Sequence, residues 1–359
     1  MQVQDQPQDT MRAILASAHG DDIDSLLSMR NDYPKPVRKE GEVLIKVCAC
    51  ALAPGDVRVL AGHCDYWQEP PNGCPYIAGG DVSGTVVETG ENSRFKLGDT
   101  VMAMFESPRP LNGLAEYISV KENLVEIAPS RVPLAWASTL PSSALCAMNA
   151  TKKYVKPGMR VLVLGGAGGV GTFFIQMAKA QGLASFVAVT STADKEWLMS
   201  LGADKVINYH EENWWEDEDF LCAEPFDLIV DLAVGRKAWM EAKRSKLLGR
   251  HGTFLSVTMD CPLMEIHNIR QTFSAMLPGM WRMIWTGLWP CSPRYVWCTD
   301  ALEIKNGRLR EVAQLVDDGI KISLDQASPL PFSEEGVKRG FHIMQKRHAH
   351  GKVVISIQE

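Results

Sequence analysis

The sequence predicts an α/β protein in which a β-rich region precedes a doubly wound parallel sheet. Between residues 133 and 258 strands alternate with helices, as in "VLVLGG" followed by "VGTFFIQMAKAQG", which is the pattern of βαβ units. Between residues 11 and 130 short β-branched stretches alternate with turns, and the chain ends in the strand-like "GKVVISI". The length of 359 residues is sufficient for two domains.

The predicted elements follow one another in a consistent order. The β-rich region contains "GEVLIKVCACAL", "GGDVSGTVVETG", "LGDTVMAM" and "LAEYISVKENLVEIAP". The α/β region continues with the strand "SFVAVTS", the helix "ADKEWLMSLGA" and the strands "KVINY", "FDLIVDLA" and "GTFLSVT". After about residue 294 we expect one more helix, "LREVAQLVDDG", before the final strand.

Composition excludes several classes of function. A net charge of −6 gives no general attraction to nucleic acid or to an anionic membrane. The first ten residues, "MQVQDQPQDT", lack the apolar or arginine-rich pattern of a targeting peptide. The nine cysteines include no CxxC pair, so we expect free thiols in a reducing compartment. We therefore expect a cytoplasmic protein, and an organelle remains open if a leader has been removed.

A glycine-rich turn joins the first strand of the α/β region to its helix. Gly166, Gly168 and Gly171 match G-x-G-x-x-G within the segment Gly166, Ala167, Gly168, Gly169, Val170 and Gly171. The first glycine permits a tight turn, the second lets the backbone approach a pyrophosphate, and the third lets helix and strand pack closely. The helix N-terminus offers free N–H groups to phosphates. The segment predicts a dinucleotide-binding site.

The next strand indicates which dinucleotide binds. A carboxylate at its tip would bind the ribose 2′-hydroxyl of NAD. The chain instead has Thr190, Ser191 and Thr192, with Lys195 one turn later, and these groups suit a 2′-phosphate. Asp194 weakens this argument slightly. We predict that the cofactor is NADPH.

Several stretches, taken together and in this order, resemble the medium-chain dehydrogenase/reductase superfamily, and within it the zinc-independent quinone oxidoreductase branch that includes zeta-crystallin-like and mitochondrial reticulon-interacting reductases. They are "APGDVRVLAG" (53–62), "GGDVSGTVVETG" (79–90), "FKLGDTVMAM" (95–104), "GLAEYISV" (113–120), "GGAGGVG" (165–171), "LGADKVINY" (201–209), "FDLIVDLAVG" (226–235) and "GKVVISI" (351–357). The resemblance implies a GroES-like catalytic domain formed by residues 11–132 and 301–359. It also implies a Rossmann NADPH-binding domain over residues 133–300, with the active site in the cleft between the two.

The residues at the family's zinc positions predict no metal. Zinc alcohol dehydrogenases of this superfamily carry a cysteine where this chain has Pro54, and a His-Glu pair where it has Gly80 and Asp81. Proline and glycine offer no ligand atom, and one carboxylate does not hold zinc. No cysteine lies between Val101 and Tyr117, where the structural zinc lobe would be. Without a Lewis acid, we expect hydride transfer to an apolar electrophile such as a quinone or an α,β-unsaturated carbonyl.

The resemblance also implies further cofactor residues. Ala233 and Val234 would line the cofactor cleft, and Tyr209 would lie near the adenosine 2′-phosphate. Cys146 stands where relatives have a threonine that contacts the nicotinamide, and it would be open to electrophiles if partly exposed. Lys352 would reach the cofactor phosphates, unless it is only the solvated start of a strand.

The substrate side departs from the quinone reductase pattern. Ala53 stands where those enzymes often have an asparagine, and Arg58 and Cys64 map roughly to their tyrosines. Tyr66 lies close to the tyrosine that enoyl-thioester reductases use as a proton donor, although a loop aromatic is an alternative interpretation. A 2-enoyl-thioester reductase and a non-enzymatic NADPH-binding protein therefore stand as alternative functions.

The segment 271–293 is rich in tryptophan and methionine and contains one charged residue, Arg282. Two helical stripes run along it, formed by Leu277, Trp281, Trp285 and Trp289 and by Met280, Ile284 and Leu288. Pro278 and Pro290 enclose eleven residues, too few to cross a bilayer. The segment could cover the substrate cleft, with Trp285 against an apolar substrate, form a dimer contact, lie on a membrane through 277–290, or be an ordinary buried helix. By resemblance, residues 293–302 form a strand that pairs two subunits into a homodimer.

Overall fold

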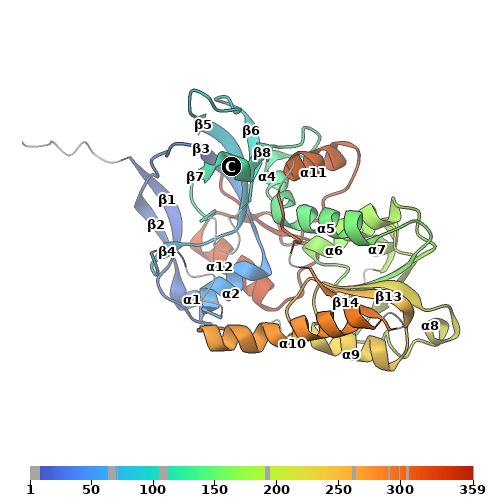
Figure 1. Ribbon diagram of the computed structural model, residues 1–359. Helices are drawn as coiled ribbons and strands as arrows, with labels where there is room; N and C mark the ends of the chain where they lie inside the picture. Colours follow the sequence, from blue (N-terminus) through green and yellow to red (C-terminus); the bar gives the residue numbers. More distant parts are fainter. Residues whose placement is uncertain are drawn as a thin grey trace, which may run out of the picture.

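A computed structural model describes residues 9–63, 70, 72–104, 112–190, 195–260, 264–289, 292–298, 300–304 and 307–358. The chain forms two lobes, one built on a mainly antiparallel sheet and the other on a parallel sheet (Figure 1). The fold class predicted from the sequence is confirmed. The proposed domain boundaries stay predictions, although the strands of the first sheet come from residues 42–127 and 330–356 and those of the second from 160–297.

The first lobe contains a seven-stranded sheet in the order β15-β16-β3-β5-β6-β8, with β7 also paired to β3. Its strands are β3 (Glu42–Leu52), β5 (Asp81–Glu88), β6 (Thr100–Ala103), β7 (Tyr117–Lys121), β8 (Val125–Ile127), β15 (Leu330–Pro331) and β16 (Val353–Ser356). The C-terminal strand β16 returns from the other end of the chain and pairs antiparallel with β3. A smaller sheet of β1 (Thr10–Ala16), β2 (Leu27–Pro34) and β4 (Tyr76–Ile77) lies in the same lobe.

The second lobe is a six-stranded parallel sheet in the order β11-β10-β9-β12-β13-β14. Its strands are β9 (Arg160–Leu164), β10 (Ser185–Thr190), β11 (Lys205–Asn208), β12 (Phe226–Asp231), β13 (Leu248–Ser256) and β14 (Arg294–Trp297). Successive strands are added on one side of β9 up to β11 and on its other side from β12 onward, so the strand order reverses between β9 and β12. In doubly wound folds this switch point opens the crevice in which ligands bind, at the carboxyl ends of the strands.

Helices cover the sheets and join the lobes. They are α1 (Ile23–Leu26), α2 (Pro54–Ala61), α4 (Leu134–Ala137), α5 (Leu140–Tyr154), α6 (Gly169–Lys179), α7 (Lys195–Ser200), α8 (Glu218–Cys222), α9 (Arg236–Arg244), α10 (Ile269–Leu288), α11 (Arg308–Asp317) and α12 (Glu334–Gln345), with a 3₁₀ turn at Glu122–Leu124. One apolar core runs through both lobes, since Val47 of β3 and Val163 of β9 belong to the same cluster of buried side chains. This shared core fixes the crevice between the lobes.

The Trp-rich segment forms a longer helix than the two prolines indicated. Helix α10 has 20 residues and contains Pro278 in its interior. Asn268 caps its start by accepting a hydrogen bond from the N–H of Gln271 at 3.0 Å, which moves the N-terminus well ahead of the proline. In the part of the chain that the structure describes, no helix has the length and apolar character needed to cross a membrane.

Candidate cofactor site between the two lobes

A cavity of about 510 Å³ lies at the carboxyl ends of β9, β10 and β12. The glycine-rich turn forms one wall, the turn after β12 forms a second, and residues 344–352 close it from the C-terminal part of the chain. Leu52 and Pro54 of the first lobe reach the same cavity. The cavity therefore sits at the switch point of the parallel sheet and between the lobes, where the sequence predicts the cofactor.

The three glycines of the motif have different surroundings. A Cβ atom on Gly171 would lie 2.3 Å from the carbonyl oxygen of Gly165 and 2.6 Å from that of Gly166, and one on Gly166 would lie 2.9 Å from the Cβ of Ala188. A Cβ on Gly168 would meet only one protein atom, the Gly165 oxygen, at 3.4 Å. The first and third glycines thus serve packing, whereas the second leaves its space open on the cavity side.

The N-terminus of α6 points its free N–H groups toward this space. The helix begins at Gly169, and its N-cap residue is Gly168, which has no side chain to accept from the first turn. Such a helix start, with glycine backbone exposed to a cavity, suits a pyrophosphate. The residues present therefore fit a dinucleotide cofactor, and the role predicted for the segment 166–171 is compatible with the geometry.

Lys352 lies directly beneath the glycine-rich turn. The N–H of Gly351 donates to the oxygen of Ala167 at 2.8 Å, and a Cβ on Gly169 would lie 2.6 Å from the Cδ atom of Lys352. The lysine is 4% exposed, and it interacts electrostatically with Asp81 and Asp56. Burial lowers the pKa of its ammonium group. This lysine is buried in the cavity wall beside the glycine-rich turn, and is not a solvated strand residue.

Two carboxyl groups, those of Asp81 and Asp56, lie near Lys352. Asp81 accepts a hydrogen bond from the N–H of Ser142 at 2.8 Å, and Asp56 accepts one from the N–H of Ala53 at 2.7 Å. Burial raises the pKa of Asp56 to about 7, even though its hydrogen bond to Ala53 and the nearby Lys352 favour the ionised form. The buried Asp56 carboxyl group therefore keeps its proton to a higher pH than an exposed aspartate does.

The turn after β12 is held by a single carboxylate. Asp231 accepts hydrogen bonds from the N–H groups of Ala233 at 3.0 Å, Val234 at 2.7 Å and Gly235 at 2.6 Å. Burial raises its pKa to about 6, although these three bonds favour the ionised form. Arg347 donates to the oxygen of Ala233 at 3.0 Å. Ala233 and Val234 consequently face the cavity in a fixed conformation.

Thr190 at the tip of β10 and Tyr209 after β11 form the end of the cavity at which the sequence predicts the adenosine. Lys195 starts α7 and lies 3.9 Å from a carboxylate oxygen of Glu211, outside the cavity wall. Ser191 lies outside the described residues. Sequence reasoning missed two cations in the wall, Lys237 and Arg347. Lys237 comes three residues after Val234, which the sequence placed in the cofactor cleft, so its position in the chain could have indicated that it lines the cavity.

Cys146 does not line the cavity, whereas Ser143, one helical turn earlier on α5, does. Cys146 is 4% exposed, and burial together with nearby Cys298 raises the pKa of its thiol to about 12. The Cys146 thiol is therefore too deeply buried to be modified by electrophiles. Cys146 lies outside the cavity wall because the face of α5 that carries it packs into the core.

The predicted substrate residues do not all come together. Ala53 precedes α2 at the cavity rim, and Arg58 reaches across the lobes to the sulfur of Met259 at 3.6 Å. Cys64 and Tyr66 lie outside the described residues. Trp285 is 52% exposed and lies in a groove between α9 and α10, so the structure does not place it in the cleft, contrary to the sequence-based prediction. Trp285 is exposed because α10 packs against the protein through its opposite face, which carries Thr272, Ala275 and Gly279.

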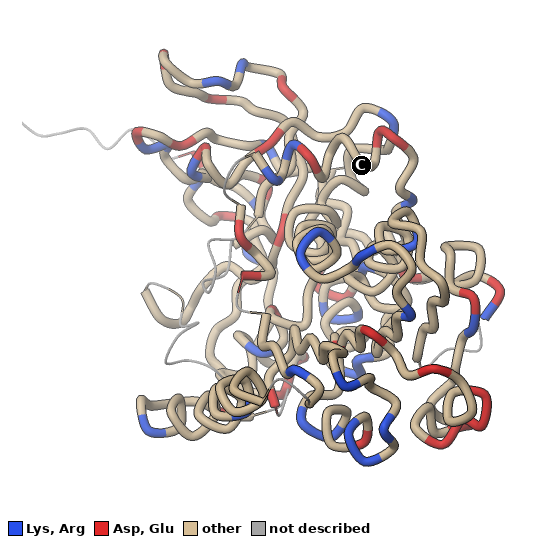
Figure 2. Tube along the Cα trace, turned by 45° about the vertical axis from the view of Figure 1, so that its right-hand side comes forward, with Lys and Arg blue, Asp and Glu red and all other residues tan. Residues whose placement is uncertain are grey.

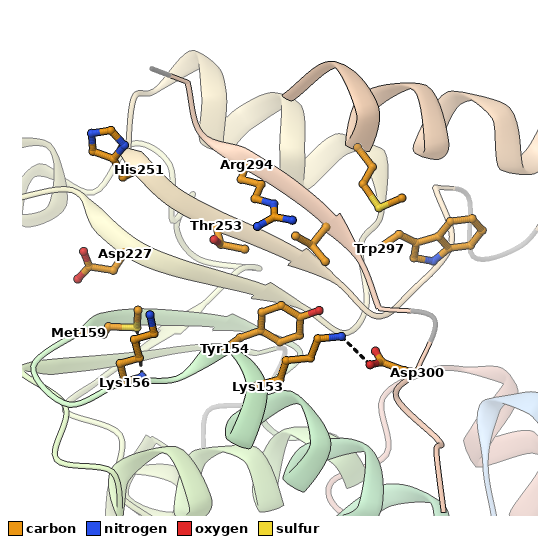
Figure 3. A pocket seen from close by; sticks show the side chains of 12 residues that line it. Lys153, Tyr154, Lys156, Met159, Asp227, His251, Thr253, Arg294, Trp297 and Asp300 are labelled. Atoms are coloured by element: carbon orange, nitrogen blue, oxygen red, sulfur yellow. Dashed lines mark hydrogen bonds and ion pairs between the residues drawn. The ribbon is translucent and has the colours of Figure 1, made fainter. Parts of the chain in front are cut away.

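A second cavity, of about 650 Å³, lies at the edge strand β14 (Figure 3). Its wall carries charged side chains such as Lys153, Asp227 and Arg294, and Figure 3 shows Lys153 paired with Asp300. It has neither the glycine-rich turn nor a helix N-terminus in its wall. The cavity between the lobes is therefore the candidate cofactor site.

The described residues contain no group of three or more His, Cys, Asp or Glu side chains that could hold a metal. Pro54 and Gly80, at the positions of the family's zinc ligands, offer no ligand atom. The absence of zinc stays a prediction.

Comparison with known proteins identifies the family. Residues 39–129 match the alcohol dehydrogenase GroES-like domain, and residues 201–355 match a zinc-binding dehydrogenase domain. The chain is 32% identical over 340 residues to the NADPH-dependent alkenal/one oxidoreductase, chloroplastic, of Arabidopsis thaliana, covering 92% of this chain and 76% of that protein. The chain belongs to the medium-chain dehydrogenase/reductase superfamily.

Other members of this superfamily support the same assignment. The chain is 32% identical over 343 residues to the human NAD(P)H oxidoreductase RTN4IP1, mitochondrial, covering 88% of this chain and 82% of that protein. The structure of the quinone oxidoreductase from Coxiella burnetii aligns with a TM-score of 0.73 at 25% identity, over 97% of this chain and 99% of that one. The resemblance to the quinone oxidoreductase branch, drawn from the sequence, is confirmed.

Proposed function

We propose that this protein is an NADPH-dependent oxidoreductase that transfers a hydride to a quinone or to an activated C=C bond. One observation carries the proposal: the glycine-rich turn, the N-terminus of α6 and buried Lys352 converge on one wall of the cavity between the lobes. The names of the Arabidopsis relative and of the Coxiella structure, an alkenal/one oxidoreductase and a quinone oxidoreductase, support this choice of acceptor.

In this proposal the chain binds and orients the cofactor along the cavity. The backbone N–H groups of Gly169 and Val170, at the start of α6, face the pyrophosphate, and Lys352 lies beneath the same turn. Thr190 and Tyr209 of the cavity wall bind the adenosine 2′-phosphate. Lys195, which begins α7 outside that wall, and Ser191 are proposed for the same phosphate. When bound, NADPH supplies the hydride. Ser143 takes the position beside the nicotinamide that the sequence assigned to Cys146.

The acceptor binds on the side of the first lobe, near Ala53, Pro54 and Arg58. The cavity wall there is apolar, with Leu52 and Val257 beside Pro54, so it favours a flat apolar electrophile and excludes water. We propose that no zinc takes part, because Pro54 and Gly80 provide no ligand atoms. A quinone or enone needs no Lewis acid to accept a hydride at its electrophilic carbon or oxygen, and a proton completes the reduction.

The experiment that tests this function measures NADPH binding and NADPH oxidation with the same protein sample. A panel of quinones, enals, enones and an enoyl-CoA is added to the NADPH complex, and the nicotinamide absorbance is followed. We expect oxidation with quinones or enones. NADPH binding without oxidation by any acceptor would show a non-catalytic binding protein, and oxidation by enoyl-CoA alone would show an enoyl-thioester reductase.

We further propose a homodimer that forms through β14. This strand is at the edge of the six-stranded sheet and pairs with β13 on its inner side. Strand edges with free N–H and C=O groups pair readily with another chain. We also propose a reducing compartment, the cytoplasm in the first instance, since Cys48, Cys50, Cys146, Cys222 and Cys298, among the described residues, are free thiols.

A further inference from the structure

Helix α10 exposes an apolar face along its whole length. Its outward residues are Ile269, Phe273, Leu277, Met280, Trp281, Ile284, Trp285 and Leu288, and Trp289 follows at its end. Trp281 and Leu288 are each 66% exposed. A helix on the surface of a globular protein normally turns polar side chains outward, so a continuous apolar face marks a binding surface.

Three tryptophans form a continuous ladder on this face. The rings of Trp281 and Trp285 stack with centroids 5.9 Å apart, and those of Trp285 and Trp289 stack at 5.5 Å. The angle between the ring planes is 19° in the first pair and 16° in the second. The ladder presents a broad aromatic surface, which suits insertion at a membrane interface because tryptophan rings prefer that region.

The opposite side of α10 is anchored, so the helix cannot turn its apolar face inward. Thr272, Ala275 and Gly279 are buried against the protein. Arg282, the charged residue in the middle of the helix, forms two hydrogen bonds with the carboxylate of Asp260, one of them at 2.9 Å. Its guanidinium also lies 4.5 Å from the ring centre of Tyr295. The exposed face is therefore a fixed feature of the fold.

Cations border the tryptophan ladder. Helix α9 lies beside α10 along the lower edge of the parallel-sheet lobe in Figure 1, and the groove between them is lined by Arg236, Met240, Lys243, Trp281 and Trp285. Residues 236–246 carry five Lys or Arg residues and a single carboxylate, Glu241, which pairs with Arg244; of the five, Lys237 lines the cofactor cavity and not this groove. In Figure 2, blue segments lie at the bottom centre of the molecule, and red segments lie to their right. This charge is opposite to the net charge of −6 of the chain.

We propose that this surface, the outer face of α10 with the cationic border of α9, docks onto an anionic lipid membrane. The apolar side chains would enter the headgroup region while the lysines and arginines contact anionic headgroups, which is the pattern of interfacial amphipathic helices. A second copy of the chain is the weaker occupant. Two-fold packing of one α10 on another would also bring their two cationic borders toward each other, and like charges repel.

The test uses the full chain and vesicles of phosphatidylcholine with or without phosphatidylserine. We expect the protein to sediment with the anionic vesicles and its tryptophan fluorescence to shift to the blue. The variant Trp281→Ser/Trp285→Ser/Trp289→Ser should bind the vesicles at least about tenfold more weakly, because binding strength scales with the apolar area that enters the interface. The variant Arg236→Glu/Lys243→Glu should lose the preference for anionic vesicles.

The matched control is Val37→Ser/Leu97→Ser, which removes two exposed apolar side chains in the other lobe and should leave vesicle binding unchanged. NADPH affinity and Tm, measured for every variant, show whether each one is folded. Binding that is absent, equal on both vesicle types, or unchanged by the tryptophan substitutions would overturn the proposal. A wild-type oligomer that the tryptophan substitutions convert to monomer, without vesicle binding, would show that the face is a subunit contact. Membrane docking and NADPH oxidation are measured separately, so one proposal can fail without the other.

Discussion

Alanine at Gly168 and alanine at Gly171 should damage the protein in different ways. Gly168 has φ −74° and ψ 171°, which alanine adopts freely, and its Cβ would meet only the Gly165 oxygen at 3.4 Å. The fold should therefore tolerate Gly168→Ala. The added methyl group would nevertheless occupy space on the cavity side of the turn, where the pyrophosphate binds in the proposed function.

The size of each effect follows from these contacts. If the Gly168 methyl group displaces the phosphate from one charge-assisted hydrogen bond, the loss is about 1.5–3 kcal/mol, or roughly 10- to 150-fold in the Kd of NADPH. For Gly171→Ala, the Cβ would lie 2.3 Å from the Gly165 oxygen and 2.6 Å from the Gly166 oxygen, both backbone atoms. The turn must shift, and we expect about 2 kcal/mol or more of lost folding stability.

The assay combines NADPH titration calorimetry with thermal unfolding in the absence of cofactor. Gly168→Ala should keep the wild-type Tm and bind NADPH at least tenfold more weakly, in line with one lost charge-assisted bond. Gly171→Ala should lower the Tm. If Gly168→Ala binds NADPH as tightly as the wild type does, the glycine-rich turn does not hold the phosphates and the assignment of the cavity is wrong.

Four further predictions test other parts of the site. Lys195→Ala should weaken NADPH binding severalfold while the Kd of NADH stays the same, because only NADPH carries the 2′-phosphate; equal effects on both cofactors would contradict the assigned contact. Asp231→Asn should destabilise the β12 turn by about 1–3 kcal/mol, since an amide cannot accept all three backbone N–H groups, and urea unfolding measures the loss. The pKa of Asp56 is raised from 3.8 to about 7, so the stability contributed by its neutral form is complete below about pH 4 and declines as the pH rises to 7, by at most about 1.4 kcal/mol per pH unit. Asp56→Asn should flatten that part of the stability profile, and an unchanged profile would show that Asp56 is already ionised. Finally, if the acceptor is bulky and apolar, kcat/KM should rise with the length of a quinone tail, whereas indifference to the tail would argue against such a substrate.

Local patterns in the sequence were sufficient for the fold and for the phosphate end of the site. The glycine-rich turn has to connect a strand to a helix, and the structure places it so. Lys352 joins that turn through the pairing of Gly351 with Gly168, a contact between distant parts of the chain that only the family resemblance indicated.

Positions that depend on the packing of one element on another were harder to predict. The rotation of α5 decides that Ser143, and not Cys146, faces the cavity. Arg347 reaches the β12 turn from the C-terminal segment, which no local spacing reveals. The periodicity of α10 showed an apolar stripe correctly, but periodicity does not say whether such a stripe faces the core or the solvent.

The most direct test of the central claim uses NADPH deuterated at its hydride-donating carbon, together with an enone. Mass spectrometry of the product then shows whether the chain transfers that hydride. The proposed function predicts a saturated ketone that carries one deuterium on the carbon β to its carbonyl group. NADPH that binds tightly but yields no reduced product, or a product without deuterium, would contradict it.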